Sequence, residues 1–96
     1  MTALNTATTA TVITVVRSHA SQHCENAILA LTELSREYLL ILDTVDATET
    51  RGRDLMRLHR APMYPLVLVG GEFFSVGRLP RVKCRQQLEA LALQGR

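Results

Sequence analysis

An alternation of apolar, β-branched runs with helical patterns most constrains what this chain can fold into. Two runs are each followed by a segment whose apolar residues recur at helical spacing, an order that favours parallel strands joined by right-handed crossovers. A third and a fourth run are separated only by Gly70-Gly71, which is typical of an antiparallel hairpin. The predicted strands cover residues 11–16, 38–45, 66–69 and 72–76, and the predicted helices cover residues 23–36, 48–60 and 81–93. The sequence therefore predicts an α/β fold of order β-α-β-α-β-β-α, with one four-stranded mixed sheet and helices on both faces.

The size of the chain suits one domain. It has 96 residues, and we expect a flexible tail over residues 1–9 and a single folded domain over residues 10–96. The formal net charge of +2 is too small to indicate nucleic acid or a membrane as partner. The N-terminal apolar run is short and has no positive charge before it, which argues against a signal peptide and favours a cytoplasmic protein.

The two cysteines, Cys24 and Cys84, are too few for a disulfide scaffold, and without more ligands they make no metal site. His19 and His23 lie near Cys24 in the sequence, but their spacing fits no standard zinc site, so we predict no metal. Cys84 shares a helical face with the leucines of the closing helix. We therefore expect Cys84 to be buried and unpaired.

The segment "RSHASQHCENAILA", residues 17–30, joins the first predicted strand to the first predicted helix. Ser21 is the predicted N-cap, and Glu25 lies in the first turn, where its charge suits the helix dipole. A thiol at a helix N-terminus is more acidic than a free thiol, because the unpaired N–H groups favour the thiolate. Many thiol enzymes place Cys-x-x-Cys at such a junction, whereas this chain has Ser21-Gln22-His23-Cys24.

The "SQHC" junction and the segments "MYPLVLVGGEFF" and "GRLPRVKCRQQL" resemble the thioredoxin fold, and within it the short glutaredoxin-like proteins common in bacteria. The resemblance covers residues 11–91 and implies a thiol–disulfide oxidoreductase. It implies a cis peptide bond before Pro65, with the backbone of Tyr64 beside the thiol site, and substrate contacts from Gln22 and His23. The implied partner is a protein disulfide or a low-molecular-weight thiol. No cofactor is implied beyond a co-substrate such as glutathione.

The sequence departs from this family at the site itself. The family's nucleophilic first cysteine aligns with Ser21, while the resolving second cysteine is kept as Cys24. A hydroxyl cannot replace the thiol, because its pKa is far too high and because sulfur exchange requires sulfur. Typical glutaredoxins also have Gly-Gly and an acidic residue after the fourth strand, which hold glutathione, whereas this chain has Val76-Gly77-Arg78.

Several interpretations of Ser21 stay open. Our main hypothesis is a glutaredoxin-like scaffold with serine at the nucleophile position, either by natural loss or by engineered replacement of a cysteine. The alternative is a redox-inactive binding module that holds a peptide or a small thiol in the groove near Pro65. Cys24 alone could also form mixed disulfides. A hydroxyl that donates to a bound thiolate, as in glutathione transferases, is disfavoured because this chain lacks their helical domain.

A basic cluster lies near the C-terminal end of the chain and contains Arg78, Arg81, Lys83 and Arg85. On a helix, such a cluster is most often a solvated face, but it could also receive an acidic partner.

Overall fold

The computed structural model describes residues 10–19 and 21–94. The order of its elements is the predicted β-α-β-α-β-β-α. The strands are β1 (Thr11–Arg17), β2 (Leu40–Asp46), β3 (Leu66–Val69) and β4 (Glu72–Val76), and the helices are α2 (Gln22–Leu34), α3 (Thr50–Leu58) and α4 (Arg81–Gln94). The tail predicted for residues 1–9 lies outside the described residues. None of the described helices combines the length and the apolar character that crossing a membrane requires.

The four strands form one mixed sheet in the order β2-β1-β3-β4. β1 pairs in parallel with β2 and antiparallel with β3, and β4 pairs antiparallel with β3. Gly70 and Gly71, which connect β3 to β4, have φ values of 60° and 86°. Glycine adopts these angles without steric cost, so the pair makes the predicted hairpin turn. The predicted four-stranded mixed sheet is confirmed.

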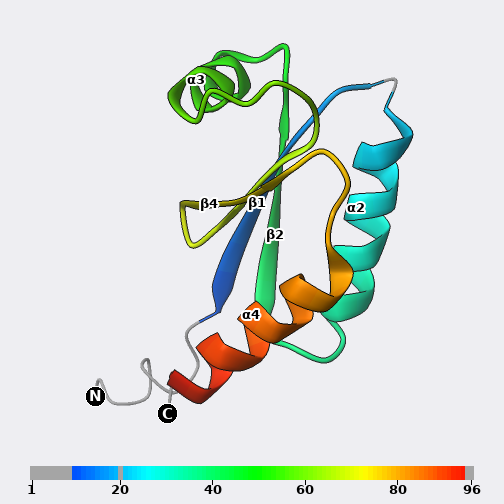
Figure 1. The fold of residues 1–96 in the computed structure, drawn as a ribbon, viewed down its shortest axis with the longest axis vertical. Coiled ribbons are helices and arrows are strands. Elements are labelled where there is room, and N and C mark those ends of the chain that lie inside the picture. Colours follow the sequence, from blue (N-terminus) through cyan, green and yellow to red (C-terminus); the bar gives the residue numbers. More distant parts are fainter. Residues whose placement is uncertain (1–9, 20, 95–96) are drawn as a thin grey trace.

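Helices cover both faces of this sheet, as predicted (Figure 1). On one face α2 and α4 pack over Ile13 and Val15 of β1, and on the other face α3 packs over Val16 and Val45. In Figure 1, α2 runs along the right side of the sheet, α4 crosses below it, and α3 lies at the upper left. β1 is consequently buried on both faces, which explains why four consecutive residues, Ile13 to Val16, are buried without alternation.

The predicted boundaries shift where local polar contacts form turns. α3 begins at Thr50 and not at residue 48, because Asp46 accepts hydrogen bonds from the N–H and the hydroxyl of Thr48 at 2.8 and 2.7 Å. These two hydrogen bonds hold the pKa of Asp46 at about 2, well below its usual value. α2 ends at Leu34, and the turn that follows returns the N–H of Tyr38 to the carbonyl of Leu34 at 2.9 Å.

Gly52 fixes how closely α3 approaches the end of β2. A Cβ atom at this position would lie 2.2 Å from the backbone oxygen of Asp46 and 3.0 Å from the Cα of Ala47. Both neighbours are backbone atoms, so no side chain can rotate away to make room. The absence of a side chain at Gly52 is therefore required for α3 to pack at this distance.

We expect Gly52→Ala to lower the free energy of unfolding by about 2 kcal/mol, because the added methyl group overpacks a backbone contact. The helix preference for alanine, about 1 kcal/mol, acts in the opposite direction and is the smaller effect. Urea denaturation followed by circular dichroism measures the difference. Arg53→Ala, at an exposed position of the same helix, is the control and should change stability by less than about 0.5 kcal/mol. Equal or higher stability of Gly52→Ala would contradict the close packing.

Candidate functional site

The predicted site residues come together at one end of the sheet. β1 and β3 are antiparallel neighbours, with Val16 opposite Leu66. The chain leaves β1 at Arg17 and enters α2 after Ser21, and it enters β3 directly from Tyr64 and Pro65. The register therefore places the segment before β3 beside the junction that leads into α2.

Ser21 caps α2, as predicted. Its backbone is extended, with φ −108° and ψ 119°, and its Oγ accepts a hydrogen bond from the N–H of Cys24 at 3.3 Å. Its carbonyl also accepts the N–H of Glu25 at 3.3 Å. Unpaired N–H groups at a helix start stabilise an oxygen acceptor or a thiolate by the same electrostatic attraction. The Ser21 hydroxyl thus occupies the place where a thiolate would receive that stabilisation.

Cys24 lies under the first turn of α2 and is 0% exposed. Its Sγ accepts a hydrogen bond from the backbone N–H of Ser18 at 3.4 Å. A partner disulfide cannot reach this sulfur while the helix start is intact. The resolving role expected for Cys24 stays a prediction.

Tyr64 and Pro65 lie directly before β3, at the same end of the sheet as the start of α2. Their peptide bond is cis, the geometry expected from the sequence. Pro65 is buried, and its carbonyl accepts the N–H of Gly77 at 2.9 Å. Tyr64 is 37% exposed, and within residues 10–19 and 21–94 neither its backbone N–H nor its carbonyl has a hydrogen-bond partner. Unpaired backbone groups of this kind can bind an extended peptide.

The two remaining predicted residues point elsewhere. Gln22 donates from its side-chain nitrogen to Oδ1 of Asn26 at 3.1 Å, along the exposed side of α2. His23 lines a pocket between the start of α2 and the loop from β4 to α4. Neither side chain has a hydrogen bond to Tyr64 or Pro65 in the part of the chain that the structure describes. Gln22 and His23 therefore border the site without joining the wall that Tyr64 forms.

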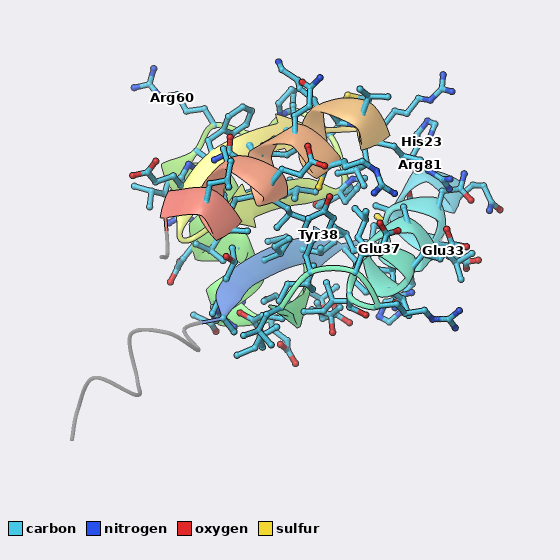
Figure 2. The ribbon with its side chains drawn as sticks, turned by 90° about the horizontal axis from the view of Figure 1, so that it is seen from below. His23, Glu33, Glu37, Tyr38, Arg60 and Arg81 are labelled. Atoms are coloured by element: carbon cyan, nitrogen blue, oxygen red, sulfur yellow. The ribbon has the colours of Figure 1, made fainter. Side chains whose placement is uncertain are left out.

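We call this cavity the arginine pocket. It has a volume of about 560 Å³ and is lined by His23, Asn26, Ala27, Arg78, Leu79 and Arg81. In Figure 2, His23 and Arg81 lie together on one side of the molecule, whereas Arg60 lies on the opposite side. Of the lining residues, only His23 was predicted as a site residue. The sequence signal for the others was the basic cluster after β4, but nothing in the sequence places that loop against α2.

Cys84 is buried in the core between α4 and the sheet, and it is unpaired, as predicted. Burial raises the pKa of its thiol. This thiol is therefore neutral near pH 7 and is shielded from partners. Its role is to fill the core as a small apolar side chain.

No protein-family model matches the sequence, and a search of curated proteins finds no match. Solved structures do match. An uncharacterised thioredoxin-like protein from Clostridium perfringens is 16% identical with a TM-score of 0.71, over 88% of this chain and 73% of that one. A thioredoxin from Thermus thermophilus is 24% identical with a TM-score of 0.61, over 97% and 82%. A reduced thioredoxin pre-protein from Schistosoma mansoni is 17% identical with a TM-score of 0.60, over 98% and 87%.

This chain has a thioredoxin-like fold. The element order, the sheet order and the three neighbours agree on this point. At these sequence identities the likeness shows the fold alone. The neighbours are described as thioredoxins or as thioredoxin-like, so the glutaredoxin-like assignment stays a prediction.

We expect both cysteines of this thioredoxin-like chain to resist a thiol reagent in the native state, because both are 0% exposed. A coloured disulfide reagent should react with both thiols of the urea-unfolded chain. In the same time it should react with almost none of the thiols of the native chain. Ser35→Cys, which puts a thiol at an exposed position just after α2, is the positive control. Rapid native labelling at Cys24 or Cys84, mapped by mass spectrometry, would contradict the burial of these two sulfur atoms.

Proposed function

We propose that this chain is a glutaredoxin-like redox scaffold in which Ser21 holds the position of the nucleophile. With serine there, the groove beside Tyr64 and Pro65 binds a partner without thiol turnover. The observation that carries the proposal is the hydrogen bond from the Cys24 N–H to Ser21 Oγ at 3.3 Å. It puts a hydroxyl, and no sulfur, at the one point of the site where the helix start favours a nucleophilic thiolate.

The absence of turnover follows from where the sulfur atoms lie. Disulfide exchange begins when an exposed thiolate attacks a disulfide sulfur. The chain has two cysteines, and both are buried with no exposed surface. The Ser21 hydroxyl is half-buried but cannot form a disulfide. No cysteine sulfur of this chain is therefore available for the first step.

Binding needs less than turnover, and the site retains what binding needs. Tyr64 offers a backbone N–H and a carbonyl that have no partner within residues 10–19 and 21–94. Its ring is partly exposed and supplies an apolar wall. An extended polypeptide segment can pair with such a backbone edge. A low-molecular-weight thiol such as glutathione, which also carries peptide groups, is the alternative occupant of the groove.

The scaffold also has the features that a restored nucleophile would use. A thiolate at position 21 would receive the Cys24 N–H that Ser21 now receives. It would attack a substrate disulfide, form a mixed disulfide and release one thiolate. Cys24, placed three positions later, would then attack the mixed disulfide and release the second thiolate. Two molecules of a small thiol such as glutathione would reduce the resulting internal disulfide by two exchange steps, leave as their own disulfide and return the site to its starting state.

We expect the unmodified chain to reduce a small disulfide no faster than buffer, and Ser21→Cys to reduce it at a clear rate. The reason is that only the nucleophile is missing. The assay follows reduction of a small disulfide in the presence of a thiol reductant. Ser21→Cys combined with Cys24→Ser should instead accumulate mixed disulfide with a protein substrate, because nothing resolves it.

Ser35→Cys is the matched control, since it adds an exposed thiol at the other end of the same helix. It should give no turnover above that of the free reductant. If Ser21→Cys folds normally, forms no disulfide with Cys24 and shows no rate, the groove does not serve redox chemistry. Turnover by the unmodified chain would make Cys24 the nucleophile, and the assignment of that role to position 21 would be wrong.

A further inference from the structure

The arginines of the basic cluster differ in whether they already have a carboxylate partner. Arg85 donates two hydrogen bonds to Glu37, at 2.6 and 3.1 Å. This contact lowers the pKa of the Glu37 carboxyl, because the neighbouring guanidinium favours its charged form. Arg78 and Arg81, by contrast, have no salt bridge among residues 10–19 and 21–94. Both side chains are exposed and line the arginine pocket.

The pocket itself contains no negative charge. All nine acidic residues of the chain lie in the described part, and none of them lines the pocket. Two permanent positive charges and His23 therefore meet there beside the positive end of the α2 dipole. Arg81 also borders a smaller cavity that Glu33 and Glu37 help to line. Arg78 does not line that smaller cavity. It lines the arginine pocket, where no acidic residue lies beside it.

The arginine pocket adjoins the groove beside Tyr64 and Pro65. The N–H of Gly77 bonds to the carbonyl of Pro65 at 2.9 Å, and Arg78 is the next residue. On the other wall, His23 lies two positions after Ser21 in the first turn of α2. Arg78 follows Gly77 and His23 lies close to Ser21 in the chain, so the arginine pocket lies next to the proposed groove. If a partner polypeptide pairs with the backbone of Tyr64, one of the partner's neighbouring side chains can reach the arginine pocket.

We propose that the arginine pocket binds an acidic side chain of a polypeptide partner whose extended backbone lies along Tyr64. This inference rests on the proposed binding function and adds the charge class of the partner. Guanidinium groups bind carboxylates through paired, charge-assisted hydrogen bonds, so Arg78 and Arg81 suit a glutamate or aspartate head group. Ala27 and Leu79 give the same pocket an apolar side for the methylene groups of that side chain.

The test uses three fluorescein-labelled decapeptides of alternating valine and threonine that differ at two central positions, which hold glutamate, glutamine or lysine. Fluorescence anisotropy measures their dissociation constants for the native chain. We expect the glutamate peptide to bind about tenfold more tightly than the glutamine peptide, which corresponds to one charge-assisted contact. In the Arg78→Glu variant this preference should disappear, and the lysine peptide should bind more tightly than the glutamate peptide. A higher salt concentration should reduce the difference in affinity between the glutamate and glutamine peptides and leave the affinity of the glutamine peptide unchanged.

Arg53→Glu is the matched control, because it makes the same charge change at an exposed position of α3, on the opposite face of the sheet. It should leave the preference for glutamate unchanged. Arg78→Ala should lose the preference for the glutamate peptide without reversing it. Circular dichroism verifies that this variant is folded. Amide chemical shifts of the labelled native chain should move at His23, Asn26, Arg78 and Arg81 when the glutamate peptide is added.

The outcomes separate this inference from the proposed function. Equal binding of the glutamate and glutamine peptides, with shifts at Tyr64 only, would overturn the acidic-partner inference and leave the groove as a binding site. No binding by any peptide or by glutathione at millimolar concentration would overturn both. Glutathione is titrated as a separate arm. Shifts at the arginine pocket with glutathione but with no peptide would assign the pocket to a small thiol and overturn the inference.

Discussion

The burial of β1 on both faces, with hydrogen-bonded neighbours on both sides, is the constraint on which the rest of this structure depends. A strand in this position is mostly apolar, and Ile13 to Val16 are all buried, with the hydroxyl of Thr14 bonded to Asp43 at 3.3 Å. Because β1 pairs in parallel with β2, the connection must cross the sheet, and α2 makes that crossing. The start of α2 is thereby fixed at the end of β1. The antiparallel pairing with β3 brings Tyr64 and Pro65 to the same end.

At that end, Ser21 makes the backbone contact of a helix N-cap, but its hydroxyl does no thiol chemistry. As an N-cap it satisfies a backbone N–H at the helix start, a contact that serine makes well and that stabilises helices by about 1 kcal/mol. The structural demand of the position is therefore met without sulfur. The chemical demand is not met, because the hydroxyl does not exchange with disulfides. Folding alone therefore does not require a cysteine at position 21. The same scaffold forms whether or not the site carries out thiol–disulfide exchange.

The parts of the fold that follow from local signals could be predicted from the sequence. The β3–β4 strands match their predicted ranges because Pro65, Gly70 and Gly71 mark their limits. Ser21 was identifiable as a cap from its place before an amphipathic segment. The arginine pocket was not predictable, because it depends on which loop packs against α2. Likewise the Arg85–Glu37 pair joins residues 48 positions apart, so the sequence could not show which arginine of the cluster is neutralised.

The distribution of charge connects the two proposals. The helix start and the arginine pocket produce a positive field at the same end of the molecule, and the two effects add. In a redox-active site with this geometry, a thiolate would supply the compensating negative charge. With serine at position 21 the group is neutral, and Glu25, the acidic residue in the first turn of α2, does not line the arginine pocket. Under the further inference, a carboxylate on a bound partner would supply the negative charge that this pocket lacks. Under our two proposals, a site of this geometry without the nucleophilic thiolate is suited to receiving an anion.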